Sequence, residues 1–440
     1  MKKLIKSLLA IALCAVAAFS TFGCSADTEE SAAGEVDIAT GNTIVKILFH
    51  VDEKSTEGQA YKKRIEAFNT AYKDKKIKAS ATYKARSAGA TGYETELTNQ
   101  QTEGTLADII TFDAPNTAAY ARSKLLYDIT ALVPEETKND FYTLNTYQGG
   151  LYGLPIQESS AGFFYNKKIF RALGIDVSGY TAENPWTFEQ FKSVCKSLKN
   201  GGYTAVDMRI DATKDEMATY LLYPFIYAAG GEFTSEDGYT AQGYFNSAKS
   251  KNGFEFIKSL ISAGYTSYSI GATDFFDGKV GMYLSSGWTI PDLDNKYKEI
   301  FANRDDWGLL PYPKGEIAAS ATGSWSYGIT NNHHTDKSAI TELYLWMASE
   351  ESSRAITTAT GMIPARRSAQ KTYDSSSPEW TLQKQLEISG KERPVTVAYP
   401  TFTTCFNNVI ASLETRNLDD LLNSNANNLQ SEMDRLKARG

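Results

Sequence analysis

The residues best placed to bind a ligand are two tryptophans that follow short predicted strands. Trp288 comes after the apolar run 280–284 through a Ser-Ser-Gly segment, and Trp325 lies in a Gly-Ser-Trp-Ser segment. Because small residues let the backbone approach a cleft closely, we expect both indole rings at a cleft wall. A flat aromatic ring there can hold a molecule with C–H faces, while neighbouring polar groups bind its hydroxyls.

Polar side chains follow two of the predicted strands and could supply those hydrogen bonds. Asp52 comes after the first strand, and Asp113 and Asn116 come after the third. In parallel sheets, ligands gather at the carboxyl ends of the strands. Asp113 could accept two hydroxyl hydrogen bonds, each worth roughly 1.5–3 kcal/mol. It could equally cap the helix that follows, with Asn116 as the competing cap.

The elements that must position these residues begin with alternating strands and helices. Residues 44–49 form a β-branched strand, and 61–72 carry apolar side chains at helical spacing. Residues 77–83 alternate like a strand, 93–103 are helical, and 107–112 form a short buried strand. This order is typical of a parallel sheet covered by helices. We therefore expect an α/β fold.

A second group of elements starts after residue 154. Residues 163–165 are strand-like, with Asn166 as the cap of a helix, and Thr187 and Gln190 predict a capping box. Helices are expected near 216–228 and 253–263. Since one core stops growing near roughly 250–300 residues, a chain of 440 residues should form two or more lobes.

Composition excludes several function classes. The formal charge is −7 and no basic run exists outside the N-terminal segment, so we expect no nucleic acid partner. The chain has three His but no His-Glu-x-x-His helix, phosphate loop or nucleophile elbow, so no metal and no cofactor are expected. Whether Cys195 and Cys405 are free or paired is left open.

The N-terminal segment is expected to direct export. Lysines precede an apolar run at 8–19, which is shorter than the roughly 20 residues that span a bilayer. The Gly-Cys pair ending at Cys24 resembles a bacterial lipobox. We predict a signal peptide at 1–23, lipid on Cys24 and a flexible tether at 24–42, with a plain secretory signal as the alternative. The body would be exported and lipid-anchored to the membrane.

Five segments, taken in order, resemble the sugar-type extracellular solute-binding proteins of ABC importers, a maltose-binding-protein-like family. They contain an Asp-Ile-Ile strand, a Tyr-Gly-Leu-Pro hinge with Phe-Tyr-Asn-Lys, a Pro-Trp-Thr helix start, a Gly-Lys-Val-Gly-Met strand with Gly-Trp, and Ile-Pro-Ala-Arg. The segments are 108–130, 152–170, 185–189, 276–288 and 361–366. Each is weak alone, but the ordered set covers nearly the whole body and is specific.

This resemblance implies a two-lobe, periplasmic-binding-protein-like fold with hinge strands and an interlobe cleft. It implies a monomeric binding protein, not an enzyme, that closes on a sugar or oligosaccharide and delivers it to an ABC permease. The expected lobes are 43–153 plus about 330–395, and 154–325 plus about 400–440.

The resemblance also implies that Trp288 stacks on a sugar ring and that further residues contact the ligand. These further candidates are Phe112, Glu158, Arg366, Tyr399 and Phe406. Arg366 could instead form a structural ion pair. Alternatives remain open: a secreted glycoside hydrolase using Asp113 and Glu158, a binding protein for a non-sugar solute, or a sensor or adhesin with this fold.

Overall fold

The computed structural model describes residues 36–86, 92–214, 216–331 and 335–438. The predicted signal peptide, the lipidation site Cys24 and the first part of the predicted tether lie outside the described residues. No helix within these ranges combines the length and the apolar character needed to cross a bilayer. Cys195 and Cys405 are both free and buried.

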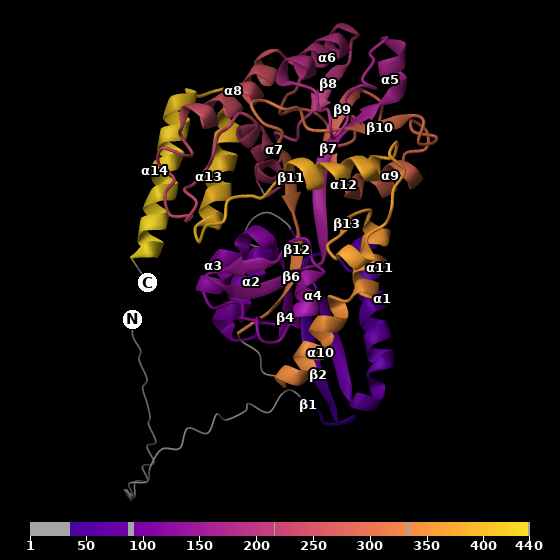
Figure 1. Ribbon diagram of the computed structural model, residues 1–440, viewed down its shortest axis with the longest axis vertical. Coiled ribbons are helices and arrows are strands. Elements are labelled where there is room, and N and C mark those ends of the chain that lie inside the picture. The colour runs from indigo at the N-terminus through magenta and orange to yellow at the C-terminus, as the bar shows by residue number, and fades with distance from the viewer. Residues whose placement is uncertain (1–35, 87–91, 215, 332–334, 439–440) are drawn as a thin grey trace, which may run out of the picture. The chain divides into compact units, whose positions relative to one another are not determined.

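The first sheet is mixed, with β12 at its centre (Figure 1). Strands β2, β3 and β4 run parallel, as the alternating pattern predicts, and β12 pairs antiparallel with both β4 and β6. Its strands are β1 (Val36–Asp37), β2 (Asn42–Phe49), β3 (Ile77–Tyr83), β4 (Ile109–Asp113), β5 (Asn145–Tyr147), β6 (Gly150–Pro155) and β12 (Trp325–Ile329).

The helices that cover the first sheet come from two separate parts of the chain, residues 56–139 and 337–360. Helix α1 packs against β3 and also against α11, which comes almost 300 residues later. Its buried face carries Tyr61, Ile65 and Phe68, as predicted from their spacing. The helices are α1 (Thr56–Ala71), α2 (Tyr93–Glu103), α3 (Thr117–Arg122), α4 (Glu135–Asn139), α10 (Lys337–Met347) and α11 (Glu350–Thr360).

The second sheet is built around the long strand β7, which pairs with β9, β10, β11 and β13. Nine of the ten residues of β7 are buried, because neighbours surround it on both edges and faces. The strands are β7 (Gln157–Asn166), β8 (Thr204–Asp207), β9 (Val280–Ser286), β10 (Trp307–Leu310), β11 (Ser320–Gly323), β13 (Ile363–Pro364) and β14 (Gly390–Lys391).

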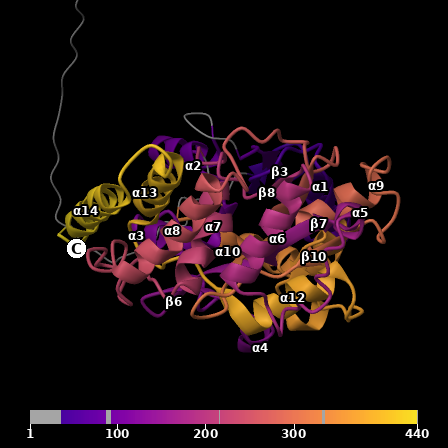
Figure 2. The same cartoon turned by 90° about the horizontal axis from the view of Figure 1, so that it is seen from above.

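The helices of the second lobe follow the sequence signals closely. Asn166 caps α5 with its side chain, and Thr187 and Gln190 form the predicted capping box of α6. Figure 2 shows α13 and α14 beside α7 and α8, which they contact. The helices are α5 (Lys167–Ala172), α6 (Phe188–Asn200), α7 (Glu216–Ala228), α8 (Ala248–Ser262), α9 (Ile290–Asn295), α12 (Pro378–Ser389), α13 (Tyr399–Ser412) and α14 (Leu418–Lys437).

The chain passes from one sheet to the other more than once, so the fold has two lobes joined by crossing segments. It crosses between β6 and β7 at Ile156, between β11 and β12 at Ser324, and again after α11. One lobe boundary differs from the prediction. Helix α12 and strand β14 fall within 330–395, which was assigned to the first lobe, but α12 packs against β7 and β14 pairs with the edge of β11.

Candidate functional site

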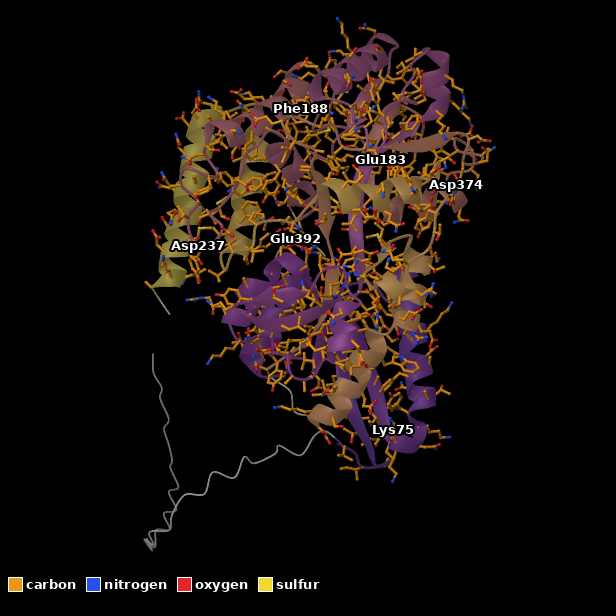
Figure 3. All side chains as sticks on the ribbon, in the orientation of Figure 1. Lys75, Glu183, Phe188, Asp237, Asp374 and Glu392 are labelled. Atoms are coloured by element: carbon orange, nitrogen blue, oxygen red, sulfur yellow. The ribbon has the colours of Figure 1, made fainter. Side chains whose placement is uncertain are left out.

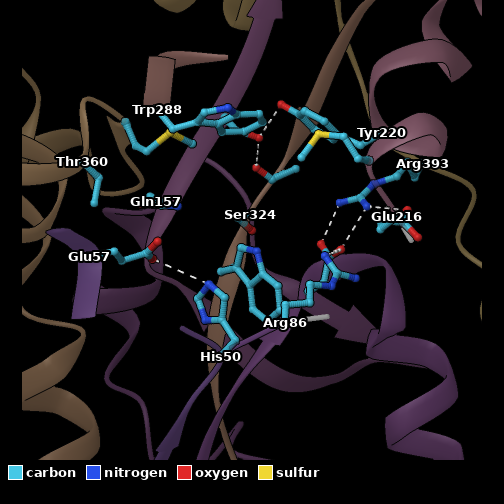
Figure 4. A pocket seen from close by; sticks show the side chains of 16 residues that line it. His50, Glu57, Arg86, Gln157, Glu216, Tyr220, Trp288, Ser324, Thr360 and Arg393 are labelled. Carbon is cyan, nitrogen blue, oxygen red and sulfur yellow. Dashed lines mark hydrogen bonds and ion pairs between the residues drawn. The ribbon is translucent and has the colours of Figure 1, made fainter. Parts of the chain in front are cut away.

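A cavity of about 220 Å³ lies between the two lobes (Figure 4). The first lobe contributes the ends of β2, β4 and β12 and the start of α1, whereas the second contributes α7 and the turn after β9. Its lining includes His50, Glu57, Arg86, Asp113, Gln157, Glu216, Tyr220, Trp288, Trp325 and Arg393. The volume is just below the roughly 300–1,000 Å³ typical of small-molecule sites.

A buried network of charges forms one side of the cavity. Arg393 donates to both oxygens of Asp113, at 3.0 Å from Nη1 and 2.7 Å from Nη2. Its Nη1 also donates to Glu216 at 2.7 Å. Arg86 approaches the same carboxylate, with Nη1 3.3 Å from Oδ2 of Asp113, and its Nε lies 2.7 Å from Glu94. The network joins β4 of the first lobe to α7 and the segment after β14 of the second.

This network fixes the charge state of Asp113. Burial opposes ionisation of the carboxyl, but the guanidinium groups of Arg393 and then Arg86 hold its pKa below the ordinary value. Asp113 is therefore an ionised acceptor at neutral pH. Its oxygens already accept from two arginines, so a ligand hydroxyl would join an existing network.

The two predicted tryptophans both line the cavity but differ in what covers them. The imidazole of His50 stacks on Trp325 with ring centroids 3.4 Å apart and planes at 4°. The guanidinium carbon of Arg86 lies 5.0 Å from the centroid of the same indole. Trp288 is 37% exposed, and its neighbour Tyr220 lies 5.9 Å away at a tilt of 45°. Trp288 therefore has the more available ring.

His50 and Glu57 lie together at another part of the wall. Nδ1 of His50 is 3.0 Å from the hydroxyl of Thr111, and Nε2 is 3.7 Å from Glu57. Burial, followed by the charge of Arg86, lowers the pKa of His50 well below its ordinary value, so the ring is neutral. Burial raises the pKa of Glu57, although the Tyr61 hydroxyl donates to it at 2.6 Å.

Two predicted site residues line a neighbouring cavity of about 620 Å³. Asn116 reaches it from the turn after β4, and Tyr399 from the start of α13. The hydroxyl of Tyr399 donates to Glu216, which, like Arg86, borders both cavities. Asn116 and Tyr399 therefore line a different cavity from the one that the tryptophans line, with Arg86 and Glu216 on the border between the two.

Glu158 lines a third, smaller cavity with Thr143 and Glu392. Figure 3 places Glu392 where the two lobes meet. The hydroxyl of Thr143 donates to Glu158. Burial raises the pKa of Glu158 to about 7, with Thr143 opposing the shift and Glu392 adding to it. Asp113 and Glu158 face different cavities, so the structure does not bring them together as an acid–base pair.

Four predicted residues line none of these three cavities. Asp52 is exposed and closes the turn before α1, where it accepts from the Lys54 backbone at 2.7 Å. Arg366 forms the structural ion pair that was its alternative, donating to Asp140 at 2.6 Å. Phe112 and Phe406 are only 1% and 0% exposed.

The two phenylalanines are core residues because of what surrounds them. Phe112 packs into the space left by two glycines, Gly328 of the adjacent strand β12 and Gly153 of β6, and Leu126 also packs against Gly328. Phe406 is enclosed by aromatic rings of the second lobe, among them Phe254 at 5.5 Å. Neither ring reaches the cleft, so neither offers a surface to a ligand.

Sequence reasoning missed most of the charged cleft. Arg86 and Arg393 lie in irregular segments outside any motif, and Glu57 resembles an ordinary charge in the first turn of a helix. One signal was available for Glu216. It opens the otherwise apolar helix α7, in which almost every residue is buried, and a charge at such a position needs a partner.

Two α/β lobes joined by crossing strands, with a charged and aromatic cavity between them, define a periplasmic-binding-protein-like class of protein. The family model for bacterial extracellular solute-binding proteins matches residues 63–387. The chain belongs to this family.

Known relatives agree with this assignment. A protein of Brucella abortus (strain 2308) whose name describes it as a binding protein is 26% identical over 251 residues. The match covers 54% of this chain and 56% of that protein, so the chain spans about half the length of the curated relatives it matches.

Two solved structures share the fold over nearly the whole chain. The cyclic alpha-maltosyl-1,6-maltose binding protein of Arthrobacter globiformis has a TM-score of 0.72 and 20% identity, covering 90% of this chain and 100% of its own. An ABC transporter solute-binding protein of Thermotoga lettingae TMO, bound with alpha-D-tagatose, has a TM-score of 0.72 and 18% identity, covering 89% and 99%.

Proposed function

We propose that this protein is the extracytoplasmic substrate-binding component of an ABC importer and that it binds a sugar between its lobes. The proposal rests on Trp288, an exposed indole at a cavity that charged and polar side chains also line. An aromatic ring next to carboxylate, guanidinium and amide groups suits a molecule with apolar ring faces and hydroxyl edges. The family and the sugars named for the similar structures support this choice.

In the proposed mechanism, the two lobes close around the ligand, and no bond of the ligand is made or broken. The sugar would contact Trp288 and Tyr220 on the second lobe and Asp113 and Glu57 on the first. A ligand that contacts both lobes stabilises the closed form over the open one. A shift from mostly open to mostly closed requires about 5.5 kcal/mol of differential affinity. The closed form would then dock on the permease.

The placement of the acids supports binding over hydrolysis. A glycosidase needs two carboxyl groups that flank one bond. Asp113 is held ionised by two arginines, and Glu158 lines another cavity. This arrangement supports release of an unaltered sugar.

We further propose that the body is held at the outer surface of the membrane through lipid on Cys24, with 24–42 as the tether, and that it acts as a monomer. The proposal rests on the sequence around Cys24 and on the family, whose members are extracellular. Mass spectrometry of the purified native protein tests it. A diacylglyceryl group on Cys24 supports the anchor, whereas an unmodified thiol at this position contradicts it.

Thermal unfolding against a panel of mono- and oligosaccharides tests the sugar proposal. A ligand at a hundred times its Kd should stabilise the protein by about 2.7 kcal/mol. The variant Trp288→Ala should lose the stabilisation given by the best sugar, while Trp380→Ala, which changes a half-buried tryptophan outside the cleft, should keep it. A sugar that stabilises Trp288→Ala as much as the wild type would refute the stacking role.

A further inference from the structure

The charges of the cleft are almost all compensated within the protein. Arg86 and Arg393 face the carboxylates of Asp113, Glu216 and Glu94 in contacts of 2.7–3.3 Å. These groups pair with one another, so each of the two guanidinium groups already faces at least one carboxylate of the protein. A ligand that carries a carboxylate or phosphate would therefore compete with these carboxylates on this side of the cavity.

Glu57 is different, because it lacks a fully charged partner among the described residues. Its carboxyl accepts from the Tyr61 hydroxyl at 2.6 Å, and the nearest basic group is the neutral imidazole of His50 at 3.7 Å. Glu57 is the second residue of α1, where the helix dipole favours a negative charge. It thus presents acceptor oxygens to the cavity with little competition from donors of the protein.

Gln157 supplies an independent observation at the same part of the wall. This residue opens β7 and is 5% exposed, yet its Oε1 has no hydrogen-bond partner. Buried amide oxygens are normally satisfied, and an unsatisfied one costs roughly 1–3 kcal/mol. Figure 4 shows Gln157 and Glu57 on one side of the cavity and Arg393 with Glu216 on the other.

We propose that Glu57 and Gln157 form an acceptor pair that determines specificity by binding a donor-rich end of the ligand and rejecting sugar acids. The inference rests on the proposed function and adds the charge class of the sugar. Either two neighbouring hydroxyls or a protonated amine would supply the donors. A uronic acid would place its carboxylate against Glu57, where like charges repel.

Matched sugars distinguish these sources of donors. Glucose and galactose are titrated into the full chain by calorimetry, each beside its 2-amino and its uronic acid counterpart. In the wild type the uronate should bind at least about tenfold more weakly than the neutral parent. Tighter binding of the amino sugar assigns the pair to an ammonium group, and tighter binding of the neutral parent assigns it to hydroxyls.

Two variants test the acceptor pair itself. Glu57→Gln removes the charge and should reduce the discrimination against the uronate to less than about threefold, while Glu53→Gln, on the exposed turn just before α1, should leave it unchanged. Gln157→Leu should weaken the neutral sugar about tenfold with Glu57 intact. Thermal unfolding without ligand establishes that each variant is folded.

The outcomes separate this inference from the function on which it rests. If the uronate binds as well as the neutral parent, or if Glu57→Gln behaves like Glu53→Gln, the acceptor pair is refuted and the sugar-binding function stands. If none of the six sugars binds the wild type, the proposed function fails for these sugars, and the inference fails with it.

Discussion

Arg393 and Asp113 form a two-pronged ion pair between residues that are 280 positions apart in the chain, and both side chains are at least 95% buried. The guanidinium belongs to the second lobe and the carboxylate to the first. The pair therefore ties the lobes together at the wall of the cleft, and its removal should affect stability as well as binding.

Replacing Arg393 tests whether this ion pair stabilises the protein. Arg393→Met should lower the free energy of unfolding by about 3 kcal/mol, because it leaves Glu216 without its guanidinium and Asp113 with only the longer contact to Arg86. Urea unfolding followed by circular dichroism measures the effect. Arg435→Met, which breaks a surface pair with Glu432, should leave stability nearly unchanged. Equal effects of the two substitutions would contradict the structural role.

The pKa of Glu158 predicts a dependence of stability on pH. Its value of about 7 in the folded protein lies above the ordinary 4.5. The folded state therefore binds this proton more tightly, and stability is lost as pH rises from about 4.5 to about 7. Glu158→Gln should remove the penalty and stabilise the protein at pH 8 relative to the wild type by about 2–3 kcal/mol. The difference should vanish near pH 4, and a gain that is constant with pH would refute the assignment.

The positions of two aromatic rings predict losses of stability of very different size. Phe406→Ala should cost about 3–5 kcal/mol, because its fully buried ring leaves a cavity. Trp288→Ala should cost less than about 1 kcal/mol, because the indole is 37% exposed, and should act on ligand binding instead. Urea unfolding without ligand measures both. A large stability loss in Trp288→Ala would show that the indole packs the lobe.

The buried cysteines predict a pattern of chemical labelling. Burial raises the pKa of both thiols, that of Cys405 to about 11. Iodoacetamide at pH 7.5 should leave Cys195 and Cys405 unmodified in the folded protein and label both in urea, as read by peptide mass spectrometry. Labelling of either peptide before unfolding would contradict the burial.

Local sequence signals were sufficient for most of the fold. The predicted strand 77–83 and helix 93–103 match β3 and α2, because alternation and a terminal glycine act within a few residues. Trp288 and Asp113, which were predicted from their places at or near the ends of strands with a recognisable pattern, both line the cavity. These features depend on neighbours in the sequence, and a single sequence contains that information.

The rest of the cleft depends on contacts between distant parts of the chain. No local pattern relates Arg393 to Asp113, and Gln157 is one of many polar residues until the fold buries it in the wall of the cavity that Glu57 also lines. Phe112 was assigned to the ligand because the family resemblance implied it. Alternation within the strand sends its side chain and that of Asp113 to opposite faces, which places the ring in the core.

The place of β12 in the first sheet also has a consequence for biosynthesis. This strand occupies the centre of that sheet, between β4 and β6, yet it is translated after most of the second lobe. A nascent chain that has emerged only as far as β11 therefore has two half-sheets that cannot join. The ribosome must deliver residue 329 before the first lobe can assemble, so an export apparatus that needs an unfolded substrate has most of the translation time in which to engage it.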